Sequence, residues 1–272
     1  MWRDLRTVLV VGLVILGGAA TAQGASITRT AGGVTAVLDY TVERPISDTY
    51  VVADGLSLTV TGPGRAPQTF GTAALRFDFP ENELAVASAL TIRDLDGNGD
   101  PEVLLTTSTG GAHCCNEVRV AWWSAAKGRY VVTSQYWGNT LPRLQDLNKD
   151  GRPEFVGFDD RFAYALNASY ASSTFPRRVW VFRSGTFVVV TKKYPGVGVL
   201  SMNRAWSNYM LLRRIGPKER FNALAAYLAS AATAGPRYRK IAWSRAVRFE
   251  KGNGVQLAAV RRQVIRLGYG VG

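Results

Sequence analysis

The sequence predicts a mainly β protein that ends in a helical region, and three observations support this. Short runs rich in β-branched and aromatic residues, bounded by Gly, Pro and Asp, recur through the first two-thirds of the chain, which is typical of strands. From residue 197 onward, apolar residues recur at helical spacing instead. Two oxygen-rich segments with the same residue pattern interrupt the strand runs. We therefore expect antiparallel sheets with helices packed beside them, where they would cover open sheet edges.

The first 22 residues have the features of a secretory signal peptide. Arg3 and Arg6 precede an apolar run from Val8 to Leu16, and Ala20-Thr21-Ala22 fits a cleavage site after Ala22. The apolar run is short for a membrane span, which needs about 20 residues. An uncleaved anchor is the alternative interpretation. We expect an extracytoplasmic protein, either periplasmic or secreted, with residues 23–196 forming the β-rich region.

The first part of that region is expected to contain several strands. We place them at Val34–Val42, Tyr50–Val52, Leu56–Thr61 and Leu75–Phe79. Ala53-Asp54-Gly55 fits a hairpin turn between the second and third of these strands. Together they would form a degenerate repeat unit without an oxygen-rich segment.

The two oxygen-rich segments begin at Asp94 and Asp146, fifty-two residues apart. Each has short oxygen-bearing side chains at positions 1, 3 and 5, Gly at position 6 and a carboxylate at position 9. Ca²⁺ takes six to eight oxygen ligands, and Gly allows the sharp bend that such a loop needs. The candidate ligands are Asp94, Asp96, Asn98, Asp100 and Glu102 in the first loop and Asp146, Asn148, Asp150, Arg152 and Glu154 in the second. Asp100 and Arg152 stand at position 7 and would contribute only their backbone carbonyls. The alternative is a pair of solvated turns.

The residues around the loops repeat as well. Strands are expected on both sides of each loop, so the helical calcium hand, with its Glu at position 12, does not fit: that position holds Leu105 or Gly157. A hairpin follows each loop and turns at Gly128 or Gly185, fifty-seven residues apart. The repeats span residues 84–138 and 141–195. A four-strand unit of this length matches a β-propeller blade, and two or three such blades fit the chain, too few for a complete propeller.

A strand, cation loop and strand with a carboxylate at position 9 resembles the FG-GAP repeats of integrin α chains and the VCBS repeats of bacterial secreted proteins. The resemblance covers residues 84–195 and implies one Ca²⁺ in each loop. These ions would be structural, because uncompensated carboxylates repel one another inside a small loop.

The His and both Cys residues of the chain stand together as His113-Cys114-Cys115. In an oxidising compartment the two thiols should pair, but adjacent Cα atoms are about 3.8 Å apart, so a vicinal disulfide would be strained. The alternatives are a Cu or Zn site made of thiolate and imidazole, or free or intermolecularly linked thiols. This segment could also act as a redox switch.

Motifs for catalysis are weak. The chain has no Gly-x-Ser-x-Gly elbow, Walker loop or Rossmann fingerprint. Asp159 and Asp160 form the spare acidic pair that a glycosidase would need, but we interpret them as a turn or an extra cation ligand near Arg161. The sequence favours a protein that is not an enzyme.

The C-terminal region, residues 197–272, is expected to be helical over Ser201–Leu212, over a segment that starts at Gly216-Pro217 and ends at Gly235-Pro236, and over Val255–Leu267. Trp206, Tyr209 and Met210 are interpreted as core. From Arg183 onward 17 Lys and Arg face two acidic residues, giving +15, while the rest of the chain carries −2.

Such a charge distribution indicates an anionic partner for the C-terminal region, either an envelope polymer or a lipid surface. A solvated basic surface is the alternative. No specific nucleic acid is predicted, and no protein partner can be named. Two function hypotheses follow: a calcium-stabilised binding or scaffold module, or a redox or metal-handling protein that acts through His113, Cys114 and Cys115.

Overall fold

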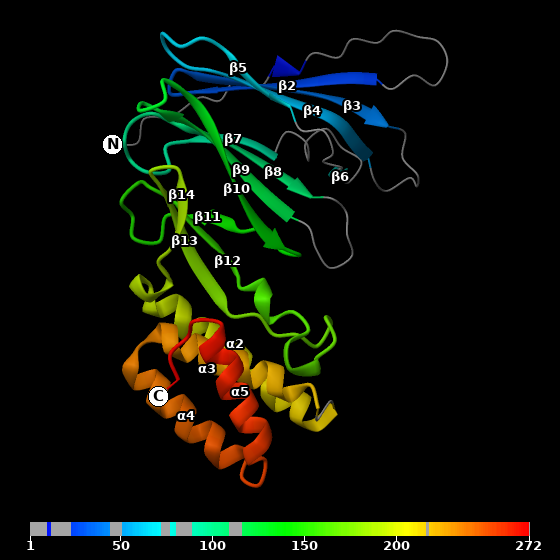
Figure 1. The fold of residues 1–272 in the computed structure, drawn as a ribbon, viewed down its shortest axis with the longest axis vertical. Coiled ribbons are helices and arrows are strands. Elements are labelled where there is room, and N and C mark those ends of the chain that lie inside the picture. The colour runs from blue at the N-terminus through cyan, green and yellow to red at the C-terminus, as the bar shows by residue number, and fades with distance from the viewer. Residues whose placement is uncertain are drawn as a thin grey trace. The chain divides into compact units, whose positions relative to one another are not determined.

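The computed structural model describes residues 10–11, 23–43, 51–71, 77–79, 89–108, 116–215 and 218–271. Within them lie three antiparallel sheets and, after the sheets, four α-helices (Figure 1). The expected fold class, mainly β with a helical C-terminal part, is confirmed. The chain divides into two compact units. One is Met1–Leu141 with Asp150–Arg152 and Phe182–Phe187, and the other is Pro142–Lys149, Pro153–Val181 and Val188–Gly272.

The first sheet has the order β1-β2-β3-β4-β5, and β6 pairs with β4. Its strands are β1 (Val10–Val11), β2 (Gln23–Ala31), β3 (Val34–Glu43), β4 (Val51–Thr61), β5 (Gln68–Gly71) and β6 (Phe77–Phe79). Strand β2 was not predicted. Alternate residues of β3 and β4 are buried, including Val34, Ala36 and Leu38, so one face of the sheet supplies the core of the first unit.

The predicted hairpin turn at Ala53-Asp54-Gly55 is wrong, because β4 runs continuously through these residues. In the pairing of β3 with β4, Asp39 lies opposite Ser57 whereas Thr41 lies opposite Asp54, so β4 carries one extra residue there. Gly55 has φ +62°, the left-handed conformation that Gly adopts without steric cost. The same residue signal that starts a hairpin therefore forms a β-bulge here.

The second and third sheets have the same topology. Each has four strands that pair in chain order, β7 to β10 in one and β11 to β14 in the other. The strands are β7 (Leu90–Arg93), β8 (Glu102–Ser108), β9 (Asn116–Ser124), β10 (Arg129–Gly138), β11 (Arg143–Gln145), β12 (Glu154–Phe158), β13 (Arg177–Arg183) and β14 (Thr186–Val189). The hairpins turn at Gly128 and Gly185, as predicted, and both glycines have positive φ.

Two short 3₁₀ helices lie in the connection between β12 and β13, and a third joins β14 to α2. They are η1 (Asp160–Phe162), η2 (Ala165–Asn167) and η3 (Thr191–Lys193). The α-helices are α2 (Pro195–Ile215), α3 (Arg220–Ala234), α4 (Pro236–Phe249) and α5 (Gly254–Arg266). Helix α4 was not predicted, although Pro236 at its first turn is a known start signal.

Helix α3 is the centre of the helical core. Nearly all of its residues from Asn222 to Ala234 are buried, many of them alanines, and α2 packs closely along it. A Cβ at Gly198 of α2 would lie 2.6 Å from the backbone nitrogen of Ala234, so this contact needs Gly. Tyr209 is fully buried, and Trp206 and Met210 pack against the same core, which confirms their interpretation as core residues.

Helix α2 also packs on the third sheet, within the second unit. Val197 contacts the cluster of Val179, Val181 and Val190. The Ser201 hydroxyl accepts a hydrogen bond from the backbone N–H of Arg177 in β13, at 2.9 Å. A helix therefore satisfies backbone groups of this sheet, in line with the expectation that helices pack beside the sheets.

Candidate cation-binding loops and basic surface

The first oxygen-rich loop joins two paired strands. Arg93 at the end of β7 lies opposite Glu102 at the start of β8, so residues 94–101 form a loop that returns to its starting point. Gly97 and Gly99 have φ of +79° and +84°. The carboxylate of Asp94 accepts both of their backbone N–H groups, at 2.7 and 3.0 Å. Because L side chains rarely adopt this backbone conformation, the two glycines let the chain curl around Asp94.

The side chains at positions 3 and 5 continue this pattern. Asp96 Oδ1 accepts the N–H of Asn98 at 3.1 Å, and Asn98 Oδ1 accepts the N–H of Asp100 at 2.6 Å. Such contacts from Asp and Asn to the backbone two residues ahead are Asx-turns. The loop is thus shaped by its own polar side chains, each of which keeps a second lone pair or oxygen for another partner.

Glu102, at the end of the loop, is hydrogen-bonded to the start of the loop. Its side chain is almost fully buried, 3% exposed, and Oε2 accepts the N–H of Leu95 at 2.7 Å. One carboxylate oxygen each of Asp94, Asp96 and Glu102 lie within 4.8 Å of one another. The pKa of Glu102 is raised to about 8, chiefly by burial and also by the charges of Asp96 and Asp94, while the hydrogen bond from the Leu95 N–H lowers it. Three oxygens that converge on a buried acid suit a hard divalent cation.

Asp100, at position 7, turns its carboxylate away to Arg65. The two side chains form a bidentate ion pair, with Nη1 2.8 Å from Oδ1 and Nη2 2.7 Å from Oδ2. Arg65 also lies over the ring of Trp123, 4.2 Å from its centroid, and donates to the Tyr130 hydroxyl at 3.2 Å. The Asp100 carboxylate is therefore engaged outside the loop, and its role as a ligand through the backbone carbonyl stays a prediction. Sequence reasoning missed Arg65, because it lies far from the loop in the chain and belongs to no motif.

The second loop repeats the backbone of the first. Lys149 and Gly151 have φ of +61° and +85°, at the positions equivalent to Gly97 and Gly99. Glu154 Oε2 accepts the N–H of Leu147 at 2.9 Å, as Glu102 does from Leu95. The position-9 carboxylate therefore has the same structural role in both loops.

The charges of the second loop are arranged differently. Arg152, at position 7, donates through its guanidinium to Asp150 Oδ2 at 2.7 Å and through its backbone N–H to Oδ1 at 2.9 Å. Arg152 thus neutralises a predicted ligand, which the sequence analysis did not foresee. Among the residues that the structure describes, a convergence of three His, Cys or acidic side chains is found in the first loop.

Several predicted sites lie outside the described residues. They are the His113-Cys114-Cys115 segment and, apart from the two residues of β1, the predicted signal peptide up to Ala22. The disulfide, metal and thiol interpretations of the cysteines therefore stay predictions.

Asp159 belongs to an ion-pair network. It caps η1, accepts two hydrogen bonds from the Arg161 guanidinium at 2.6 and 2.7 Å, and is 2% exposed. The Tyr269 hydroxyl and Arg178 also donate to it, at 2.7 and 3.4 Å. Burial opposes ionisation of Asp159, but these partners hold its pKa below the usual value. This agrees with the interpretation of Asp159 as part of a turn beside Arg161.

The four α-helices carry no Asp or Glu at all, whereas α4 alone carries five basic residues. Glu250, which follows α4, is 2% exposed and binds Arg220 at 2.9 Å and the Tyr209 hydroxyl at 2.7 Å. Its negative charge is therefore compensated inside the core. The helical surface is strongly cationic as a result. None of the helices in the described part of the chain is both long enough and apolar enough to cross a bilayer.

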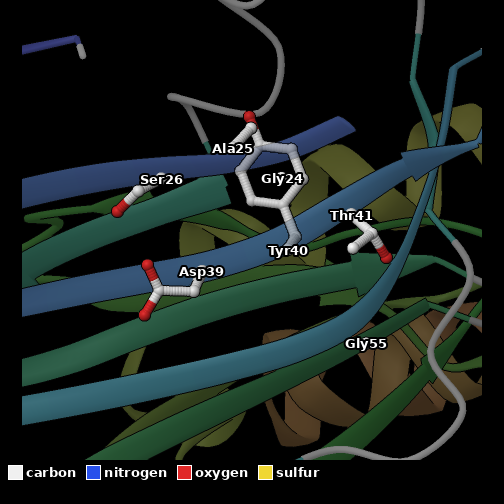
Figure 2. Close-up of a pocket in the computed structure, with 7 residues that line it drawn as sticks. All are labelled: Gly24, Ala25, Ser26, Asp39, Tyr40, Thr41 and Gly55. Carbon is white, nitrogen blue, oxygen red and sulfur yellow. The ribbon is translucent and has the colours of Figure 1, made fainter. Parts of the chain in front are cut away.

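A shallow hollow lies on the first sheet (Figure 2). Gly24, Ala25 and Ser26 of β2 face Thr41, Tyr40 and Asp39 of β3, and Gly55 of the bulge completes the lining. The hollow forms because Gly24 and Gly55 have no side chains to fill it. Asp39 is the one charged residue in this lining, so the hollow has no cluster of groups suited to chemistry.

Comparisons with known proteins give a partial match. The chain matches no protein-family model, and no solved structure matches it. A probable thylakoid lumen protein of Synechocystis sp. is 38% identical over 150 residues, which cover 54% of this chain and 44% of that protein. The matched segment therefore spans less than half of the relative's length.

Proposed function

We propose that this protein is an extracytoplasmic, calcium-stabilised binding module without catalytic activity, whose basic helical part engages an anionic envelope component. The observation that carries the calcium assignment is the convergence of Asp94, Asp96 and Glu102 on one point, with Glu102 buried. A buried carboxylate beside two others is unfavourable unless a cation or a proton compensates it. A divalent ion would supply that compensation and lock the loop between β7 and β8.

The repeat interpretation adds support. Two four-stranded sheets, each opening with a strand, an oxygen-rich loop and a strand, match what FG-GAP and VCBS-type blades would look like. The matching φ angles and position-9 hydrogen bonds of the two loops are consistent with descent from one repeated unit. Calcium would be structural in this scheme, and we expect the first loop to bind more tightly, since Arg152 competes for Asp150 in the second.

Two observations support an extracytoplasmic localisation. The N-terminal sequence has the charge and hydropathy pattern of a signal peptide. The relative described above is named a probable thylakoid lumen protein, and the thylakoid lumen lies outside the cytoplasm. Calcium is abundant enough outside many cells to fill weak sites with Kd of about 10⁻⁴–10⁻³ M.

The anionic partner is supported by the helical surface. Every charged side chain on α2 to α5 is Arg or Lys, and Glu250 is buried in ion pairs. Such a surface attracts polyanions and anionic lipid, and this attraction weakens with salt. If the basic helical surface is only solvated and has no partner, its binding to anionic polymers or vesicles would not saturate.

Thermal unfolding with and without calcium tests the proposal. We expect Ca²⁺ to raise the Tm of EDTA-treated protein, and Mg²⁺ at the same concentration to raise it less, because Mg²⁺ demands tighter octahedral geometry. Sedimentation with vesicles of phosphatidylglycerol and phosphatidylcholine should show binding that falls with NaCl. Identical unfolding curves in EDTA and Ca²⁺ would show that the loops are turns that bind no calcium. Equal sedimentation with neutral and anionic vesicles would contradict the proposal of an anionic partner.

A further inference from the structure

A pocket in the second unit is built from segments that are far apart in the sequence. Its volume is about 340 Å³. Arg178 of β13 lies on one wall, η3 with Lys192 and Lys193 on another, and Leu267 to Tyr269, which follow α5, on a third. This volume falls within the range of small-molecule sites, about 300–1,000 Å³, and exceeds what a bare inorganic ion needs.

The lining of this pocket is cationic and contains no acidic residue. Lys192 and Lys193 are exposed, so their ammonium groups can turn toward a ligand. Arg178 lies over the Trp180 ring, 5.3 Å from its centroid, which limits the freedom of its side chain. A guanidinium held over an aromatic ring, beside two flexible lysines, suits a group with several anionic oxygens.

The acidic group nearest to this lining is already satisfied. Asp159 takes its two short charged contacts from Arg161 and another from the Tyr269 hydroxyl, while its contact with Arg178 is longer, at 3.4 Å. Arg178 therefore keeps donors for a ligand. Arg161 also reaches the pocket wall, since it donates to the carbonyl of Leu267. The side chains in and beside the pocket therefore carry four positive charges, on Arg178, Lys192, Lys193 and Arg161, and one negative charge, on Asp159.

The remaining walls are apolar or polar without charge. Val189, Val190 and Leu267 supply apolar surface, and Thr191 already exchanges hydrogen bonds with the backbone of Val179. A ligand with an anionic head and a short apolar or hydroxylated portion would use both kinds of wall.

We propose that the pocket formed by Arg178, Lys192, Lys193 and the segment Leu267–Tyr269 binds the phosphate group of a phosphate ester. This deepens the proposed function, on which it rests, by giving the anionic partner a defined site and chemistry. The ester could be the headgroup of a lipid or a soluble organic phosphate, since both present anionic phosphate oxygens, with one negative charge on a diester and up to two on a monoester.

The test compares two double variants of the full chain, in calcium and at fixed ionic strength. Lys192→Gln with Lys193→Gln removes two cations from the pocket. Lys127→Gln with Arg129→Gln removes two exposed cations of the hairpin between β9 and β10, outside both the pocket and the basic helical part, and is the matched control. Both pairs are exposed, so both variants should fold, which their unfolding curves verify. Titration calorimetry measures binding of glycerol 3-phosphate, with acetate as the competing anion. Sedimentation measures binding to phosphatidylglycerol vesicles.

We expect the pocket variant to weaken binding by at least about tenfold, as the loss of two charged contacts to phosphate implies, and the control to change it less than about twofold. A loss in the vesicle arm identifies a lipid headgroup, and a loss confined to glycerol 3-phosphate identifies a soluble ester. Equal losses in both variants, or acetate binding as tight as that of the ester, would overturn the site. The proposed function fails separately, if wild-type protein shows neither a calcium shift in Tm nor salt-sensitive sedimentation.

Discussion

Replacing Glu102 by Gln tests the first loop most directly. Gln keeps the size of the side chain and an oxygen that can accept the Leu95 N–H, but it cannot ionise. The folded protein raises the pKa of Glu102 from 4.5 to about 8, first through burial and then through the neighbouring Asp96 and Asp94. The charged form is therefore disfavoured in the metal-free fold.

The sign of the pH effect follows from these two pKa values. Between pH 4.5 and about 8 the folded state holds a proton that the unfolded chain has released. The free energy of unfolding of the metal-free protein should then fall as pH rises through this window and level off above it. Each pH unit between the two pKa values is worth about 1.4 kcal/mol, which sets an upper limit of about 5 kcal/mol for the whole loss.

Glu102→Gln should remove this loss. In EDTA at about pH 9 we expect the variant to be more stable than wild type, by up to that limit, and to differ little near pH 5. With calcium bound, wild type should instead be more stable than the variant. At a concentration of about 100 times its Kd, Ca²⁺ adds about 2.7 kcal/mol to wild type, and the variant should lose most of this gain.

Urea unfolding followed by tryptophan fluorescence, at several pH values in EDTA and in Ca²⁺, measures both effects. Asp39→Asn is the control, because it removes one carboxylate from an exposed position of β3. Parallel pH curves for wild type and Glu102→Gln in EDTA would refute the account of a buried, disfavoured charge. A full calcium shift in the variant would show that Glu102 does not hold the ion.

Three further substitutions test the fold. Gly198→Ala should destabilise the protein by about 1–3 kcal/mol, measured by urea unfolding, because the new Cβ would overlap the backbone at Ala234. Gly196→Ala on the same helix is the control: its Cβ meets no atom within 4 Å, so it should be neutral or slightly stabilising. Gly99→Ala forces a side chain into φ +84° and should cost about 1–2 kcal/mol, with Ca²⁺ recovering part of the loss if the ion holds the loop. Burial opposes ionisation of Glu250, yet its ion pair and hydrogen bonds hold its pKa below 4.5, so wild type should lose stability as pH falls below about 4.5. Glu250→Gln should be less stable by about 3–5 kcal/mol at neutral pH and should lack this acid-dependent loss; an unchanged acid dependence would contradict the assignment.

Local patterns predicted the repeated strands, the hairpins at Gly128 and Gly185 and most of the helices. Each of these depends on neighbours in the chain: alternation, turn glycines or apolar spacing. Gly55 was misread because a turn and a bulge both need a residue at positive φ, and only the strand partner decides between them. Helix α4 was missed because five basic residues dilute its apolar stripe.

The sequence by itself determined the two loops, the order of their oxygen-bearing side chains and the cationic character of the C-terminal region, because spacing and charge are properties of the chain. Only the tertiary structure decided how those charges are used. Folding buried Glu102 next to Asp94 and Asp96, paired Asp100 with Arg65, and set Arg152 against Asp150. It also brought Arg178 beside Lys192 and Gly268 to form a pocket. The physical reason is that burial and the approach of distant charges change what a carboxylate or guanidinium can bind, and neither can be read from local spacing.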